Sequence, residues 1–145
     1  MTQKPMYREV KTKEDMEKFD SEWLKICYEK GATFYPYHSN SKRYFILDDN
    51  GSDVGTIEFT KRDPKVFSVC EHYFDYANHP KVSKNENEII EVGKICIFKN
   101  FRSEGHVEKL IYLMLDYANQ YGIKQYLGYM NKEFLLVLRM CYGVK

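Results

Sequence analysis

The stretch from Glu91 to Val107 constrains this chain more than any other part of its sequence. It continues a run of apolar residues on both faces of an expected strand: Ile89, Ile90, Val92, Ile95, Cys96, Ile97 and Phe98. A short polar loop with one glycine follows, and a helix is expected from about His106 to Tyr121. Its apolar spacing predicts a buried face made of Val107, Leu110, Ile111, Met114, Leu115 and Ala118. The first amides of a helix have no partners within it, and its dipole favours negative charge there. A strand that passes through a tight polar loop into a helix therefore has a geometry that can hold a phosphate.

The other elements follow from periodicity and turn signals. Further strands are expected at Met6–Lys11, Arg43–Leu47, Val54–Thr60 and Ile123–Met130. One further helix is expected to begin after Thr12, a good N-cap, and to end at Gly31, and another is expected at Lys132–Tyr142. Asp48-Asp49-Asn50-Gly51 is a strong turn signal, so the strands on either side of it should form a hairpin. Gly55 inside the second hairpin strand suggests a bulge or a close backbone approach. The stretch from Lys61 to Asn87 gives weak signals, and its last ten residues are expected to form a polar loop.

This order predicts the fold class. Two strands joined by the long central helix imply a right-handed parallel crossover, whereas the hairpin upstream supplies antiparallel strands. The expected fold is therefore α/β of the α+β type, with a mixed, mainly antiparallel central sheet. A length of 145 residues with 43% hydrophobic residues suits one domain, residues 1–145, with a core of its own.

Composition and charge argue against several functions. The formal net charge of +1 supplies no strong field that would select nucleic acid or an acidic membrane. No apolar run approaches the roughly 20 residues that a membrane-spanning helix needs. The first residues, Met1 to Pro5, lack the apolar segment of a signal peptide, and the four cysteines show no Cys-x-x-Cys spacing. A cytoplasmic protein with reduced thiols is expected.

Glu91, the apolar strand ending at Ile97, four spacer residues and Arg102-x-x-Gly105-x-Val107 at a helix start form one ordered pattern. This pattern resembles the acyl-CoA-binding core of the GNAT acetyltransferase superfamily, and the order of elements extends the resemblance over nearly the whole chain. The family normally adds a closing strand pair after its last helix, and this chain stops at Lys145 without it. A truncated chain, a short member and a sheet completed by a second chain are the three alternatives.

The resemblance implies a site for acetyl-CoA or another acyl-CoA. The pyrophosphate would meet the loop residues Arg102, Ser103, Glu104, Gly105, His106 and Val107, and the pantetheine arm would meet backbone groups of Ile95, Cys96 and Ile97. Asn131, where the family often places a pantetheine contact, fits equally well as a helix N-cap. Val107 is bulkier than the family's Gly or Ala, and Glu104 adds a negative charge. An ordinary helix start is the alternative interpretation of this loop.

The resemblance also implies candidate catalytic residues. Glu91 would act as the general base that takes a proton from the amine, with Glu88 as a competitor; a solvated glutamate at a strand end is the alternative. Many GNAT enzymes protonate the leaving thiolate with a tyrosine four residues before a glycine. Counting back from Gly143, that position holds Arg139, which can stabilise a thiolate but is a poor proton donor.

The resulting hypothesis is an N-acyltransferase that moves an acyl group, most simply acetyl, from acyl-CoA to a primary amine of a small molecule or peptide. The alternative is a GNAT-like module without catalysis that binds CoA or a protein, for example as a homodimer. No metal is expected: Cys70, His72 and His79 lie near one another in sequence but lack the paired spacing of a zinc site. The acceptor amine cannot be named from the residues.

Overall fold

The computed structural model describes residues 4–63, 70, 75, 78–83, 88–128, 134–136 and 139–140. In chain order the elements are β1 (Tyr7–Glu9), α1 (Lys13–Lys30), β2 (Ser41–Leu47), β3 (Asp53–Lys61), α3 (Pro80–Ser83), β4 (Ile89–Ile97), the 3₁₀ turn η2 (Lys99–Phe101), α4 (Val107–Tyr121) and β5 (Gln125–Gly128). Among these residues, no helix has the length and apolar character needed to cross a membrane.

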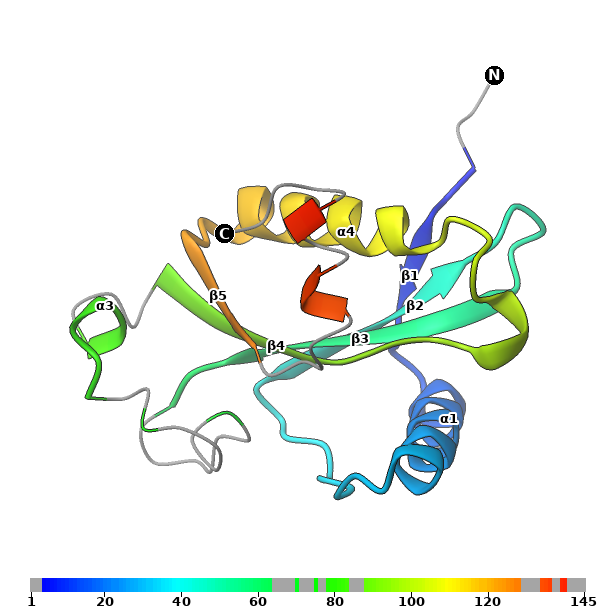
Figure 1. Cartoon of the computed structure of the whole chain (residues 1–145), viewed down its shortest axis with the longest axis horizontal. Coiled ribbons are helices and arrows are strands. Elements are labelled where there is room, and N and C mark those ends of the chain that lie inside the picture. Colours follow the sequence, from blue (N-terminus) through cyan, green and yellow to red (C-terminus); the bar gives the residue numbers. More distant parts are fainter. Residues whose placement is uncertain are drawn as a thin grey trace.

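Five strands form one sheet in the order β1-β2-β3-β4-β5. The first three pairs are antiparallel, and β4 pairs with β5 in parallel. Helix α4, which connects β4 to β5, covers one face of the sheet, and α1 lies beneath the other face (Figure 1). The expected mixed sheet with one parallel crossover is confirmed.

The main core lies between the sheet and α4. Leu110, Leu113 and Tyr117 of α4 are buried, and the Tyr117 ring stacks on Phe59 of β3 with ring centroids 4.1 Å apart. The sequence pattern placed Leu115 on the buried face, but it is 56% exposed. That interpretation counted only aliphatic residues and Ala, whereas the Tyr117 ring occupies the middle of the interface. Residues two apart on a helix point about 160° apart, so Leu115 faces away.

On the opposite face, α1 begins and ends where the sequence predicts. Thr12 caps its N-terminus by accepting a hydrogen bond from the Asp15 amide (3.0 Å), and Gly31 ends it with φ 66°. Its Phe19 packs against Phe45 of β2, with ring centroids 5.7 Å apart.

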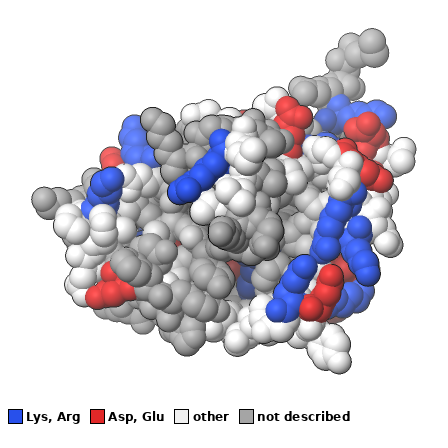
Figure 2. All heavy atoms as spheres, in the orientation of Figure 1, with Lys and Arg blue, Asp and Glu red and all other residues white. Residues whose placement is uncertain are grey.

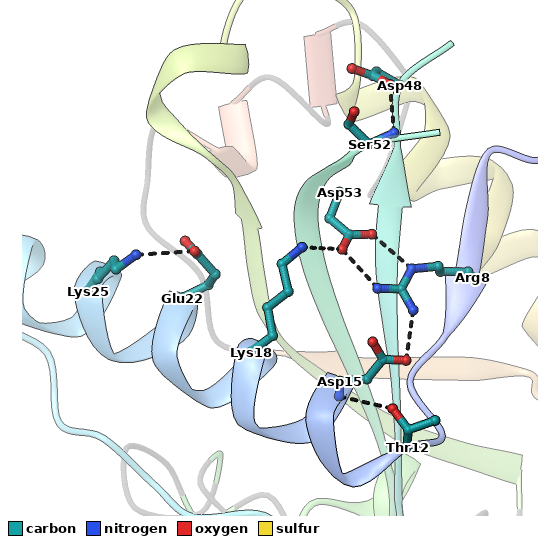
Figure 3. A network of polar contacts seen from close by, with 9 residues as sticks. All are labelled: Arg8, Thr12, Asp15, Lys18, Glu22, Lys25, Asp48, Ser52 and Asp53. Carbon is teal, nitrogen blue, oxygen red and sulfur yellow. Dashed lines mark hydrogen bonds and ion pairs between the residues drawn. The ribbon is translucent and has the colours of Figure 1, made fainter. Parts of the chain in front are cut away.

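A polar network ties the start of α1 to the sheet (Figure 3). Arg8 of β1 donates two hydrogen bonds to Asp53 of β3 (2.9 and 2.8 Å) and one to Asp15 of α1 (2.7 Å). Lys18 of α1 adds a contact of 2.5 Å to Asp53. These side chains come from three elements, so the network fixes the position of α1 against the sheet.

Gly55 shows why the hairpin needs a glycine. A Cβ at this position would lie 2.5 Å from the carbonyl oxygen of Cys96 on β4, so only glycine allows the two strands to approach. The expected polar loop at 78–87 contains the single helical turn α3. The proline after His79 suits the start of a helical turn, and the Val82 amide donates a hydrogen bond to the His79 carbonyl oxygen (2.9 Å). Residues 129–133, which include Asn131, lie outside the described residues.

Candidate functional site

The pairing of strand β4 with its neighbouring strands changes about halfway along its length. Its parallel ladder with β5 runs from Ile89 to Val92. Beyond it, β4 carries a bulge, because Thr56 of β3 pairs with Cys96 while Glu58 pairs with Gly93. The bulged residue Lys94 has φ 48°, a left-handed conformation that residues other than glycine seldom adopt. Among the described residues, the ladder between β4 and β5 ends at Val92, before the bulge.

The loop that follows β4 has an unusual backbone. Ser103 and Gly105 have φ 69° and 83°, so two left-handed residues alternate with others just before α4. A Cβ built on Gly105 would meet no atom within 4 Å, so conformation and not crowding requires the glycine. Amides that alternate between right- and left-handed residues form concave groups of donors suited to anions.

The N-terminus of α4 is uncapped. Its N-cap residue His106 makes no side-chain capping bond, in contrast to Thr12 at α1. Within the described residues, the amides from Ser103 to Glu108 donate to no backbone or side-chain acceptor. Such a row of donors at the positive end of a 15-residue helix suits a phosphate group.

The side chains of the loop turn back onto the protein. Arg102 donates from Nε to the carbonyl oxygen of Ile97 (3.0 Å) and lies 3.8 Å from Glu29 of α1. Glu104 contacts His106, whose ring is buried, with 3.3 Å between Oε2 and Nε2. Val107 is half-buried at the start of the helix. The loop therefore presents mainly backbone groups, as a phosphate site built from amides requires.

Three predicted pantetheine contacts lie on β4 between the bulge and the loop. Ile95 and Ile97 pack against the core beneath α4, and Cys96 is buried on the other face. Burial raises the pKa of the Cys96 thiol, although a hydrogen bond with Arg102 opposes this effect. Cys96 is thus held as a thiol, and what these residues can offer a ligand is their backbone.

The structure places Glu91 at the opposite end of β4 from the loop. Its side chain is buried, and Arg62 Nη1 donates to its Oε1 at 3.1 Å. At about 3.3 Å per residue, Glu91 lies about 20 Å along the strand from Ile97. A ligand that joins the loop to Glu91 must therefore be extended, with phosphates at one end and its reactive group at the other.

Sequence reasoning missed a buried charged row beside Glu91. Arg43 of β2 is fully buried; it donates to Glu58 of β3 (2.7 Å) and to Asp20 of α1 (2.8 Å). Lys94 of β4 lies 3.5 Å from Glu58 and donates to the backbone carbonyl of Tyr35 (2.7 Å). Burial lowers the pKa of Lys94, while Glu58 opposes this effect. The available signal was the presence of charged residues within three otherwise apolar strands.

This row adds buried charges to the face of the sheet that α1 covers, beside the apolar cluster of Phe19 and Phe45, whereas the face that α4 covers is mainly apolar. A cavity of about 360 Å³ opens at the start of β2; the residues that line it include Tyr37, Ser41 and Arg43. Ser41 faces Thr60, which in turn pairs with Glu91, so the cavity and Glu91 share one cross-strand row. A polar ligand can therefore be accommodated on this face.

Two further predictions have less support in the geometry. Arg139 lies in a short helical segment and is exposed, and Asn131 lies outside the described residues. Among the described residues, no three His, Cys, Asp or Glu side chains gather as a metal site requires; His72 is not among those residues. The described cysteines Cys27, Cys70 and Cys96 are not joined in disulfides.

Basic side chains gather on one side of the molecule. Figure 2 shows Lys and Arg over the side where α1 and the C-terminal end of β4 lie, with a few acidic residues among them. The loop after β4 is on this side. Such a distribution favours the approach of an anionic ligand, although the net charge of the chain is only +1.

Comparisons with known proteins show several solved structures with a similar fold. A structure of an N-acyl amino acid synthase from uncultured soil microbes, FeeM, is similar with a TM-score of 0.73 and 10% identity, over 92% of this chain and 75% of that one. A predicted acetyltransferase from Clostridium acetobutylicum, crystallised with acetyl-CoA, has a TM-score of 0.64 and 12% identity, over 96% and 88% of the two chains. An aminoglycoside N-acetyltransferase in complex with CoA has a TM-score of 0.58 and 12% identity, over 96% and 90%.

At these identities the similar structures establish the fold alone, and no curated protein sequence matches the chain. The profile of the acetyltransferase (GNAT) family, in contrast, matches residues 6–133, which is most of the sequence. The match includes β4, the loop with Gly105 and all of α4. The chain therefore belongs to the GNAT family of acetyltransferases.

Proposed function

We propose that the protein is an acyl-CoA-dependent N-acyltransferase, which moves an acetyl or longer acyl group to a primary amine of a small molecule or peptide. Family membership supports acyl transfer in general. The observation that carries the proposal to this chain is the uncapped N-terminus of α4 after β4, where the amides from Ser103 to Glu108 donate to no acceptor among the described residues.

In this proposal, the loop amides bind the CoA pyrophosphate, and Gly105 allows the phosphate to approach the backbone closely. The pantetheine arm then lies along β4 between Ile97 and the bulge at Lys94, beyond the end of the described ladder with β5, where its amide groups can bond to the β4 backbone. The thioester reaches the part of β4 near Glu91. Asn131 and the backbone of Ile95 and Cys96 complete the proposed contacts.

Glu91 is proposed as the general base. Its carboxylate takes a proton from the incoming ammonium group, directly or through one water molecule. The neutral amine then attacks the thioester carbonyl; the new C–N bond forms and the C–S bond breaks, so that CoA leaves as a thiolate. The acylated nitrogen loses its second proton, which passes through solvent to the thiolate. Arg62 holds the Glu91 carboxylate at 3.1 Å and so fixes its direction. The role proposed for Arg139 is electrostatic stabilisation of the thiolate.

The acceptor is proposed to lie on the polar face of the sheet, beside Glu91 and the charged row of Arg43, Glu58 and Lys94. A cytoplasmic location and a homodimer also remain proposals, and they rest on the sequence alone. Light scattering at high protein concentration would test the homodimer directly.

The first experiment measures acetyl-CoA and CoA binding by calorimetry and then thiol release with a panel of primary amines. We expect binding at micromolar ligand and release that depends on the amine. Glu91→Gln keeps an acceptor for the Arg62 hydrogen bond but cannot take a proton, so turnover should fall 10²- to 10⁴-fold while CoA affinity is unchanged. Glu88→Gln, an exposed neighbour, is the matched control. No CoA binding at millimolar ligand would refute the proposal.

A CoA-binding protein without catalysis is the second candidate function. The buried ion pair between Arg62 and Glu91 favours it, because a carboxylate that is fixed in a pair can serve a purely structural purpose. In that case CoA would bind normally, no amine would promote thiol release, and Glu91→Gln would alter only the free energy of unfolding.

A further inference from the structure

Glu104 is out of place in a loop that binds an anion, yet its carboxylate is not free. Its Oε2 lies 3.3 Å from Nε2 of His106, and Nδ1 of the same ring lies 3.3 Å from Nζ of Lys109. Lys109 Nζ also donates to the carbonyl oxygen of Leu47 at 2.7 Å. A chain of contacts thus runs from the loop through a buried ring to the end of β2.

The chemistry of the three groups sets the direction of these hydrogen bonds. Lys109 carries only donors, so Nδ1 of His106 must be the acceptor in their contact. A neutral imidazole with an acceptor at Nδ1 carries its hydrogen on Nε2. His106 therefore donates to Glu104, and Lys109 sets the tautomer that allows it to do so.

The surroundings keep this arrangement in place. The ring of His106 is 8% exposed and packs edge-on near Phe101, with 6.4 Å between ring centroids. From the turn between β2 and β3, Asp49 faces Lys109 at 4.0 Å. The Glu104 side chain itself is 55% exposed, so the ring of His106 is what fixes its direction.

We propose that His106 is a positioning residue for the CoA diphosphate: with Lys109, it holds the Glu104 carboxylate against its own ring and so keeps the loop amides open. The inference rests on the proposed function, because it concerns the same loop. A carboxylate released from the ring would be free to accept from the amides of its own loop and would repel the phosphates. The position of the Glu104 carboxylate therefore determines how tightly the loop binds a diphosphate.

Two variants separate the charge of Glu104 from its position. Glu104→Gln keeps an acceptor for His106 but removes the charge, so the Kd for CoA should fall three- to tenfold, with a smaller effect at high salt. Asp116→Asn, which lies further along α4 and is also exposed, keeps an acceptor for Tyr7; it is the matched control and should change the Kd less than twofold. Because Glu104 is exposed, neither variant should alter the fold.

The position is tested at His106. His106→Leu removes the donor and should raise the Kd about tenfold, whereas His106→Gln, which can still donate, should recover much of the loss. When Glu104→Gln is already present, adding His106→Leu should raise the Kd for CoA only slightly, since no carboxylate remains to be held. A merely structural role for His106 predicts the same penalty in both backgrounds, and that result would overturn the proposal.

The ligand series locates the effect. The changes should appear equally with CoA and dephospho-CoA, which share the diphosphate, and should be absent with pantetheine, which has no phosphate. An equal change with pantetheine would contradict a diphosphate role. If wild type and every variant fail to bind CoA, the proposed function fails; if wild type binds and Glu104→Gln leaves the Kd unchanged, only the present inference fails.

Discussion

Gly105 combines two properties that mutation can separate. Its φ of 83° disfavours any side chain, but the space around it is open. Gly105→Ala should therefore lower the free energy of unfolding by only about 1–2 kcal/mol, the cost of the left-handed conformation. The same added methyl group should weaken CoA binding at least tenfold, because it projects where a phosphate must approach.

Gly51 in the hairpin turn is the matched control. Its φ is 80° and its surroundings are also open. Gly51→Ala should cost a similar amount of stability in urea unfolding but should leave the Kd for CoA unchanged. An equal loss of CoA affinity in both variants would show that Gly105 acts only through stability.

At this scale the sequence predicted residues with local roles better than residues with long-range roles. Thr12 and Gly31 were predicted as caps of α1, because a cap depends on the neighbouring backbone. Lys109 was not singled out, because its partners, Leu47 and Asp49, are far away in sequence. The pairing of Glu91 with Arg62 was likewise invisible, since it depends on how the chain between them folds.

At the scale of elements, the contact between β3 and β4 depends on one glycine. Gly55→Ala would place a methyl group 2.5 Å from a backbone oxygen of Cys96, and a strand backbone cannot move cheaply. We expect a loss of about 2–4 kcal/mol in chemical unfolding. Gly93→Ala on β4 meets no atom within 4 Å and should cost less than about 1 kcal/mol. Similar losses in both variants would contradict this account.

The elements themselves were largely predictable, but their exact faces were not. The apolar period of α4 indicated a helix with one buried side, and the structure confirms it. The buried side is turned toward Tyr117, because stacking on Phe59 outweighs the aliphatic pattern. The bulge at Lys94 was not predicted, since it arises from pairing between β3 and β4 and leaves no local signal in the sequence.

At the scale of the whole molecule, the network of Figure 3 should make stability depend on acid pH. Burial raises the pKa of Asp53, but hydrogen bonds from Arg8 and Lys18 outweigh it and lower the pKa below 3.8. A hydrogen bond from Arg8 also lowers the pKa of Asp15. Groups with a depressed folded pKa stabilise the fold above their unfolded pKa, and this contribution is lost as pH falls through the folded pKa.

Unfolding free energies measured from pH 6 down to pH 2 should therefore fall below about pH 4 in the wild type. Asp53→Asn should lower stability at pH 6 by about 1–2 kcal/mol, after allowance for the partial exposure of Arg8, and should flatten the acid decline. Asp49→Asn, in an exposed turn, is the control and should keep the wild-type slope. An unchanged slope in Asp53→Asn would contradict the assignment.

The global fold was predictable because hydrophobic period and turn residues specify the order of elements, and the right-handed crossover rule limits how they connect. Of the candidate site, the sequence could predict only the features that local backbone conformation determines, such as the glycine turn at Gly105. Its side-chain partners come from β2, β3 and α1, and no pattern in one sequence specifies which of their charged residues meet.

Because Glu91 and the loop lie at the two ends of one strand, β4 fixes the distance between them. The rise per residue of the strand determines this distance, and the bulge changes it locally. Any donor that binds through its phosphates must therefore have its reactive carbon at a fixed distance from them, whatever acyl group it carries. In the proposed function, β4 therefore sets the length of the CoA part of the donor, and only residues beyond Glu91 can discriminate among acyl groups.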